Sequence, residues 1–463
     1  MNDSNSQSMT PLERRATFSL AGIFMMRMLG LFLILPVFAV YAEHLPGATP
    51  FMIGLALGAY GLTQSVLQIP FGMASDRFGR KPVIVVGLLV FIAGSIIAAN
   101  AKSLELIVVG RALQGAGAIA AAVLAMVADL TRERQRTKAM ALIGVSIGAS
   151  FILSLLLGPV INSWIGIPGI FWLTAVLAAL GILVLLTLVP TPVRARRRTG
   201  EQSLTTQFRT VLTRPELLRL DFGIFVLHSV LTAVFVVVPL SLVHKAGFPV
   251  DHHWQLYLPV MLAGVAIMVP FLLFSDRQGA LRPVFVGAVG FLSLSQAIFY
   301  VGAGRFWWIA AGLVLFFGAF NLLEATLPSL ISKTAPVESK GTAIGVYNSF
   351  EFFGAFVGGA MGGWFYGKFG ANGVFMMSFA LISAWVLVAW GMREPERHDT
   401  HTLRFSAGSP EETEALAARL EAVEGVSEVV LVAEEGLAYI KTNARFLNRA
   451  ELEAILPPEQ AAH

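Results

Sequence analysis

Three residues that could carry protons lie inside segments that are otherwise apolar. Glu324 occurs in NLLEATLP, Glu351 in NSFEFFG and His228 in FVLHSVL. A titratable group in such a segment is costly, and by default it indicates a functional site. We therefore expect these side chains to bind protons. Glu324 is the first candidate because Pro328, four residues later, loosens its helix.

A structural role is the alternative for each of these groups. Glu324 could pair with a buried arginine, and His228 could be a neutral histidine with a hydrogen bond in the core. Glu351 ranks second among the carboxylates. Asp221 lies at the start of an apolar segment, so we expect it at the membrane interface.

Two arginines also lie in apolar segments. Arg27 is about ten residues into the first, and Arg111 is about seven residues, or about 10 Å, into the fourth. An arginine there needs a counter-charge or water, so both are candidate functional residues, and a structural ion pair is the alternative for Arg111. Gln64 and Asn321 (and, with them, Gln68 and Asn348) either line a cavity or hold helices together.

The composition places these residues in a membrane. Only 13% of the chain is charged and 56% is hydrophobic, and the mean hydropathy is +0.72, whereas about a quarter of an ordinary globular chain is charged. The chain has no cysteine, which excludes disulfides, thiolate metal sites and iron–sulfur clusters. We predict no metal and no cofactor, with H⁺ as the coupling ion. The absence of a visible nucleophile–base pair or phosphate loop argues against an enzyme.

Apolar segments of about 20 residues predict an all-α polytopic membrane protein. The predicted helical spans are 17–42, 52–74, 82–100, 104–130, 138–163, 168–190, 219–244, 254–274, 283–302, 306–332, 340–367 and 373–392. We place a tight turn between the fifth and sixth spans at Gly166–Gly169. The predicted domains are 1–16 (N-terminal segment), 17–190 (first six-helix half), 191–218 (linker), 219–392 (second six-helix half), 393–401 (linker) and 402–463 (tail domain).

The distribution of basic residues predicts the orientation. Twenty Lys and Arg residues fall in one alternating set of connectors and four in the other. Cytoplasmic loops carry the positive excess, so both termini are expected in the cytoplasm. The basic pI of about 9.4 then reflects topology and lipid contact, and no nucleic-acid partner is expected.

The two predicted halves repeat each other. SDRFGRKP (75–82) has an echo in SDRQGALRP (275–283), and TKAMALIGV (137–145) has one in SKGTAIGV (339–346). Each echo lies on the matching connector of its half. Repeated six-helix halves are typical of secondary transporters, although channels also contain repeats.

The stretch GMASDRFGRKP (72–82) gathers charge between two apolar spans. Gly72 and Gly79 allow close approach and unusual backbone angles, and Arg80 can reach a carboxylate or a helix end. The pattern resembles the signature between spans 2 and 3 of the major facilitator superfamily. The resemblance implies a latch that holds the two halves in one state. Its predicted members are Gly72, Asp76, Arg77, Gly79, Arg80, Lys81 and, as the more distant carboxylate, Asp129. Simple orientation charge is the alternative.

Three further motifs extend the resemblance. RALQGAG (111–117) resembles the superfamily's span-4 motif, which implies proton coupling for Arg111 and, with it in the cavity, for Arg27. LGLFLILP (29–36) resembles the span-1 pattern of the superfamily's twelve-span drug:proton antiporters. The span-5 antiporter motif is partial: Gly158 and Pro159 are present, but Asn162-Ser163 replaces the closing glycine pair. That departure weakens the antiporter interpretation and leaves the superfamily resemblance intact.

The tail after residue 401 has a different composition. TLRFSA, VSEVVLVA and LAYIKTN predict strands, and PEETEALAARLEAVEG and RAELEAIL predict helices. This βαββα order predicts a small α+β, ferredoxin-like domain. It also resembles heavy-metal-associated domains, but its first loop has no cysteine. Regulation or self-association is a hypothesis for this domain, and an inert appendage is the alternative.

Together these features predict a proton-coupled secondary active transporter that works by alternating access. The resemblance favours export of a small, amphipathic or drug-like molecule across a bacterial inner membrane. The alternatives are a proton-coupled uptake symporter and a ligand-sensing transceptor that signals through the tail. The expected partners are a small-molecule substrate, protons and lipid, and the helical part is expected to be monomeric.

Overall fold

The computed structural model describes residues 8–191, 204–278, 280–302, 304–336, 339–392, 398–404, 410–432, 437–443 and 455. The chain forms two compact units, Met1–Met392 and Arg393–His463. We call them the helical unit and the tail unit, and each is described by itself.

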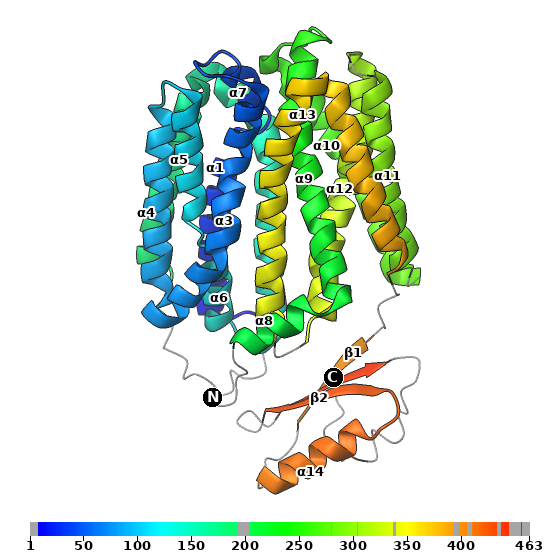
Figure 1. The fold of residues 1–463 in the computed structure, drawn as a ribbon. Helices are drawn as coiled ribbons and strands as arrows, with labels where there is room; N and C mark the ends of the chain where they lie inside the picture. The colour runs from blue at the N-terminus through cyan, green and yellow to red at the C-terminus, as the bar shows by residue number, and fades with distance from the viewer. Residues whose placement is uncertain are drawn as a thin grey trace. The chain divides into compact units, whose positions relative to one another are not determined.

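The helical unit consists of helices that run roughly alongside one another (Figure 1). Its α-helices are α1 (Pro11–Phe32), α2 (Phe38–Ala42), α3 (Pro50–Phe78), α4 (Arg80–Ala99), α5 (Leu104–Ala116), α6 (Ala120–Leu130), α7 (Glu133–Thr187), α8 (Leu204–Leu212), α9 (Pro215–His244), α10 (His253–Gln278), α11 (Leu281–Gly302), α12 (Phe306–Thr334) and α13 (Lys340–Trp390), and a short 3₁₀ helix, η1, covers Val250–His252. Ten helical segments of the described chain are long and apolar enough to cross a membrane. The chain is therefore a mostly helical, multi-pass membrane protein.

Two of these segments are long enough to cross twice. α7 has 55 residues and α13 has 51. Each contains a glycine in the left-handed region, Gly166 with φ 65° and Gly370 with φ 66°, which a residue with a Cβ adopts only with strain. The first glycine lies in the predicted turn. If each helix is counted as two spans, the ten segments match the twelve predicted spans, and the number of crossings itself stays a prediction.

Two predicted spans are interrupted. The first, predicted as 17–42, stops at Phe32 and resumes as α2, because Pro36 cannot donate a backbone hydrogen bond. The fourth, predicted as 104–130, breaks between α5 and α6 at Gly117. Hydropathy does not reveal such breaks, since the residues within them are as apolar as their neighbours.

The linker predicted at 191–218 is partly helical. It contains α8 and the first turn of α9. Thr342 of α13 donates a hydrogen bond to Gln207 of α8, with 2.7 Å between the oxygens. Residues 192–203 lie outside the described chain.

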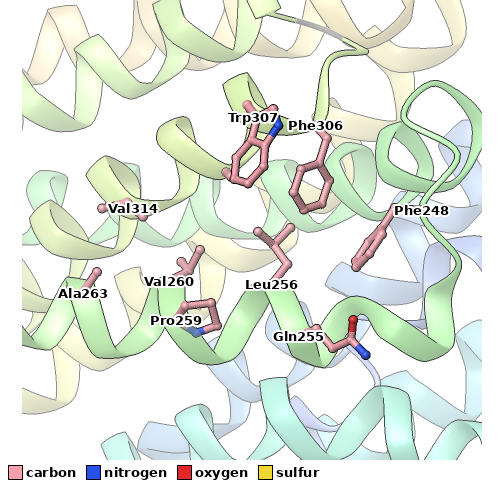
Figure 2. Close-up of a pocket in the computed structure, with 10 residues that line it drawn as sticks. Phe248, Gln255, Leu256, Pro259, Val260, Ala263, Phe306, Trp307 and Val314 are labelled. Atoms are coloured by element: carbon pink, nitrogen blue, oxygen red, sulfur yellow. The ribbon is translucent and has the colours of Figure 1, made fainter.

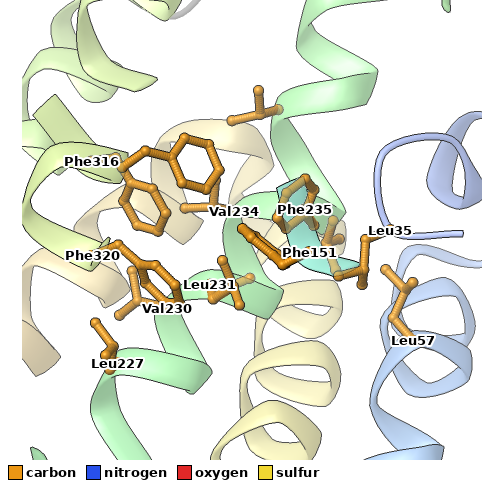
Figure 3. Close-up of a cluster of buried hydrophobic side chains, with 14 of the residues drawn as sticks. Leu35, Leu57, Phe151, Leu227, Val230, Leu231, Val234, Phe235, Phe316 and Phe320 are labelled. Atoms are coloured by element: carbon orange, nitrogen blue, oxygen red, sulfur yellow. The ribbon is translucent and has the colours of Figure 1, made fainter. Parts of the chain in front are cut away.

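The helical unit has two ends. The proximal end is where α1 begins and α13 ends, and the distal end carries the connectors at 43–49 and 245–252 (Figure 1). We call α1–α7 the first half and α9–α13 the second half. A cluster of buried apolar side chains joins them: Phe151 of α7 lies 6.0 Å from Phe320 of α12 and 6.5 Å from Phe235 of α9, centroid to centroid (Figure 3).

The distal parts of the two halves touch through glycines. A Cβ at Gly58 of α3 would lie 2.8 Å from the Phe356 carbonyl oxygen of α13, and one at Gly359 would lie 3.0 Å from the Gly58 nitrogen. On the proximal part of α13, a Cβ at Gly345 would have no neighbour within 4 Å. At the distal end His244 Nε2 lies 2.8 Å from the Glu43 carboxylate of the other half. The halves therefore meet closely at their distal ends.

The tail unit contains β1 (His398–Arg404), α14 (Pro410–Glu421), β2 (Val426–Val432) and β3 (Leu437–Asn443). The strands form an antiparallel sheet in the order β1-β3-β2, and Leu420 and Ile440 are fully buried in its core. β1 begins inside the segment predicted as a linker, because His398 pairs with Asn443. Most of the last predicted helix lies outside the described residues, so the complete ferredoxin-like domain stays a prediction.

Candidate functional site

Three titratable side chains meet in the second half. His228 lies on α9, Glu324 on α12 and Glu351 on α13, and one ligand atom from each lies within 4.8 Å of the others. His228 Nε2 is 3.6 Å from a Glu351 carboxylate oxygen. The sequence predicted each residue separately, and the fold brings all three into one site, which we call the central cluster.

The central cluster contains a polar atom without a partner, because Glu324 Oε2 is buried and forms no hydrogen bond. The His228 ring interacts with the Ile224 carbonyl, one turn earlier on α9. Asn321 Nδ2 also has no partner, but it lies on the side of α12 that meets Gly264 of α10. Tyr347, 3% exposed, has an unpartnered hydroxyl and interacts electrostatically with Glu324 and Glu351. Buried polar atoms normally have partners, so the cluster retains unused capacity to bind a proton, an ion or a polar group.

Asp221 lies elsewhere on α9. It was expected at the membrane interface, and the structure buries it at 1% exposure. Neither carboxylate oxygen has a hydrogen-bond partner.

The first half contributes Arg27. Its Nη2 donates to Gln64 Oε1 at 2.7 Å and to the Gly117 carbonyl at 3.1 Å. At the break between α5 and α6, that carbonyl also accepts from the Ile119 backbone nitrogen at 2.9 Å. Gln64 in turn donates to Gln68 at 3.0 Å. The two glutamines therefore form a polar chain that starts from the arginine.

Arg111 is held differently. Its Nη1 donates to Gln114 Oε1 at 2.8 Å, and Gln114 donates to Ser95 at 2.8 Å. In the described chain neither Arg111 nor Arg27 forms an ion pair with a carboxylate. The ion-pair alternative, for Arg111 as for Glu324, is therefore not what the structure shows.

Tyr60 lies between the two arginines, and no sequence motif singles it out. The Arg111 Cζ is 5.2 Å and the Arg27 Cζ 5.8 Å from the Tyr60 ring centroid. The same ring lies 6.0 Å from that of Phe352, next to Glu351. Tyr60 is thus the point where the basic residues of the first half approach the acidic residues of the second.

The predicted latch residues gather at the proximal end. Arg80 Nε donates to Asp129 Oδ2 at 2.9 Å, Nη1 donates to Ser75 Oγ at 2.7 Å, and Asp76 is a further partner. Lys81 Nζ donates to the Val189 carbonyl at 2.5 Å.

The remaining latch residues shape the corner between α3 and α4. Gly79 joins the two helices with φ 99°, a Cβ at Gly72 would lie 3.3 Å from the Ala121 Cβ, and the Arg77 Cζ lies 5.4 Å from the Phe78 ring centroid. All the contacts described for the latch residues lie within the first half. The side chains of its echo at Asp276 and Arg277 lie outside the described residues.

The partial span-5 motif packs against the span-1 motif. Gly158 of α7 faces the break after α1: a Cβ there would lie 2.6 Å from the Leu33 carbonyl oxygen and 2.9 Å from Pro36 Cγ. Pro159 follows within α7. Gly158 therefore provides space for the interrupted first span.

Sequence reasoning missed one further group in the first half, at the proximal end. Glu13 accepts from the Arg132 side chain at 2.9 and 3.0 Å and from the Arg132 backbone at 2.8 Å. The sequence T-P-L-E at the start of α1 signals a capping box with Thr10, which the structure contains. The pairing with Arg132 has no comparable local signal.

A pocket of about 500 Å³ lies away from the central cluster, between α10 and α12 (Figure 2). Leu256, Val260 and Phe306 line it, together with Trp307, which is 79% exposed. The pocket is therefore at the outer surface, and it is apolar apart from Gln255.

Comparison with known proteins gives consistent matches. A family model described as Major Facilitator Superfamily matches residues 20–359 and 260–432. The inner membrane transport protein YajR of Escherichia coli (strain K12) is 45% identical over 449 residues, which cover 97% of this chain and 98% of that protein. Multidrug resistance protein 2 of Bacillus subtilis (strain 168) is 28% identical over 352 residues, 72% of this chain and 84% of that protein. A crystal structure of the nucleoside transporter NupG shares the fold, with a TM-score of 0.64 and 15% identity over 81% of this chain and 98% of that one.

Proposed function

The chain belongs to the major facilitator superfamily, and on that premise we propose that it is a proton-coupled secondary active transporter that exports a small molecule. Its relatives are transporters and not enzymes. We place it in a bacterial inner membrane, as the name of the Escherichia coli relative states for that protein. The excess of basic residues on alternate connectors supports cytoplasmic termini.

The central cluster is the observation that carries proton coupling. Two carboxyl groups and an imidazole lie within 4.8 Å of one another, and two like charges at such a distance repel strongly in a medium of low dielectric constant. Protonation of one group relieves that repulsion. A change in hydration during the transport cycle would therefore change the number of bound protons.

Alternating access is supported by the unequal contact between the halves. The distal parts interlock through Gly58 and Gly359, whereas Gly345 faces open space on the proximal part. An arrangement closed at one end is expected of a transporter whose cavity opens at the other. With cytoplasmic termini, this state would face the cytoplasm.

Export of an amphipathic molecule is supported by two observations. One relative at 28% identity is named a multidrug resistance protein. Next to the central cluster, the Phe320 ring lies 6.0 Å from the His228 ring, centroid to centroid. Phe320 also packs against Phe151 and so belongs to the aromatic cluster described above. A substrate with an apolar body and a polar or cationic group would match this combination.

The test begins with a ligand screen, because a ligand that binds the folded protein raises its unfolding temperature. A ligand found in this way is then offered to proteoliposomes with an imposed pH gradient. Exchange with protons predicts accumulation in vesicles with an acidic interior. Accumulation driven by an acidic exterior would instead indicate a symporter, and flux indifferent to the gradient would contradict proton coupling.

Substitution of Glu324 tests the proposed proton site. Glu324→Gln keeps the shape of the side chain but cannot ionise, so we expect it to bind ligand and to lose gradient-driven flux. Asp251→Asn, at an exposed acid in η1, is the matched control and should transport normally. Wild-type flux and pH dependence in Glu324→Gln would show that Glu324 is not the proton carrier.

A further inference from the structure

The central cluster combines donor atoms that also suit a metal ion. An imidazole nitrogen and two carboxylate oxygens are common ligands of Zn²⁺, Co²⁺ and Mn²⁺. His228, Glu324 and Glu351 are the one group of His and acidic residues that could hold a metal in the part of the chain the structure describes. The sequence predicted no metal, because these residues are far apart in the chain and match no ligand spacing.

The distances are close to those of a coordination shell. Two ligands of a tetrahedral zinc ion are separated by about 3.4 Å, given metal–ligand bonds of about 2.1 Å. His228 Nε2 and the Glu351 oxygen are 3.6 Å apart. Glu324 completes a group within 4.8 Å, so its carboxylate needs to move by at most about 1.4 Å to reach that separation. Because Glu324 Oε2 forms no hydrogen bond, metal binding would not break one.

Tyr347 is a candidate further ligand. Its buried hydroxyl has no hydrogen-bond partner and interacts electrostatically with both carboxylates. Asn321 lies one helical turn before Glu324 on α12, but its amide nitrogen lies beside Gly264 of α10, on the side away from α13.

The charges around the cluster determine what it can hold. On the second half, Tyr347 interacts electrostatically with Glu324, Glu351 and Asp221. On the first half, Tyr60 interacts with Glu351 and with the two arginines, Arg27 and Arg111. In the described chain no ion pair links either arginine to the cluster. Two ionised carboxylates with a neutral imidazole carry two negative charges, which a divalent cation would neutralise as two protons would.

We propose that His228, Glu324 and Glu351 form a binding site for one divalent transition-metal cation, which competes with protons for the same three side chains. The proposal concerns the site of the proposed function but does not require proton-driven transport. Metal ligands must be deprotonated, so each bound cation should displace protons, and binding should weaken as the pH falls.

Co²⁺ titration of the full chain in lipid nanodiscs, after removal of any affinity tag, tests the proposal. We expect about one ion per chain, the visible absorption of Co²⁺ in a nitrogen–oxygen site, displacement by Zn²⁺ and release of protons into weakly buffered medium. His228→Gln and Glu351→Gln should each weaken binding by at least about tenfold. An unchanged Co²⁺ spectrum in both variants, or no saturable binding, would overturn the site.

The controls separate this site from surface histidines and from the transport hypothesis. His244→Ala removes an exposed histidine that already pairs with Glu43 and should leave the Co²⁺ spectrum intact. If it abolishes the spectrum, the metal binds at the distal end and the proposal is wrong. Each variant is first checked for a wild-type unfolding temperature. Metal binding without gradient-driven flux would contradict only the proposed function, and flux lost in Glu324→Gln without metal binding would contradict only the metal site.

Discussion

At the scale of residues, the two halves of the helical unit carry opposite charges, fully buried in the first half and partly buried in the second. Arg27 and Arg111 lie in the first half and Glu324 and Glu351 in the second, with Tyr60 between them. Such groups persist in an apolar surrounding only if they compensate one another, bind protons or meet water. A small rearrangement at Tyr60 would therefore change how strongly the arginines favour ionised carboxylates.

We predict that the ring of Tyr60, and not its hydroxyl, stabilises this region. The buried hydroxyl makes at most a weak contact with the Arg27 side chain, so Tyr60→Phe should change the free energy of unfolding by less than about 0.5 kcal/mol. Tyr60→Leu removes the surface on which both guanidinium groups rest and should cost about 2 kcal/mol. Chemical unfolding in micelles measures both. If both variants lower the free energy of unfolding by the same amount, the hydroxyl and not the ring is what stabilises this region.

A second prediction concerns the pair formed by Arg80 and Asp129. The two side chains are 18% and 29% exposed, so a double-mutant cycle with Arg80→Ala and Asp129→Ala should give a coupling energy of about 1 kcal/mol. Arg80→Lys keeps the charge but lacks the guanidinium that reaches Asp129 and Ser75 at once, so it should recover only part of the coupling.

The latch hypothesis makes a separate prediction for Arg80. All its described partners lie in the first half. Contact with the second half is then available only when the proximal ends approach, so Arg80→Ala should favour the state open at the proximal end. Spin labels on cysteines placed at Thr137 and Lys333 can measure this distance, because the chain has no native cysteine. If Arg80→Ala leaves the distance distributions unchanged, the latch hypothesis is wrong, and the charge of Arg80 serves only to orient the protein in the membrane.

At the scale of elements, the sequence was sufficient to place apolar helices and insufficient to show their interruptions. The segment around Gly166 was predicted as a turn because a glycine–proline cluster separates two long apolar runs. The break at Gly117 has no such signal. The break is accompanied by a tertiary contact, since the Gly117 carbonyl accepts from Arg27 as well as from the Ile119 backbone.

The two halves repeat hydrogen bonds as well as sequence motifs. Arg15 and Lys81 donate to the carbonyls of Thr187 and Val189 at the end of α7. Arg219 and Arg282 donate to the carbonyls of Gly391 and Trp390 at the end of α13. Basic groups stabilise helix C-termini, and each pair comes from corresponding helices of its half. The meeting of His228, Glu324 and Glu351 was not predictable in this way, because three separate helices supply them.

The glycines of α13 give a prediction with an internal control. Gly359→Ala would place a methyl group against the backbone of α3, whereas Gly345→Ala enters open space on the same helix. We expect Gly359→Ala to separate the distal ends and Gly345→Ala to leave them together, with a gain of up to about 1 kcal/mol in helix propensity. Labels at His44 and Asp251 report the distal distance. Equal distances in the two variants would contradict the inferred distal closure.

At the scale of the whole molecule, the chain joins a membrane unit to a small α+β unit with a core of its own. The tail unit buries Leu420, Val423, Ala438 and Ile440, and its strand order β1-β3-β2 is the one expected for a split βαβ unit. The alternating pattern of its strands made this part predictable. Its task was not predictable, since the residues that would bind metal in the domains it resembles are absent.

We predict that the two units fold independently. Removal of residues 393–463 should leave the unfolding temperature of the helical unit unchanged, and the isolated segment should show cooperative unfolding with a stability of about 3–5 kcal/mol, as expected for a small domain without disulfides. Circular dichroism of both pieces measures this. Transport by the truncated chain then decides between two hypotheses. Unchanged flux indicates that the tail is not an essential gate and leaves self-association or regulation as its role. Loss of flux with a wild-type unfolding temperature would show that the tail takes part in the cycle, as a ligand-sensing transceptor requires.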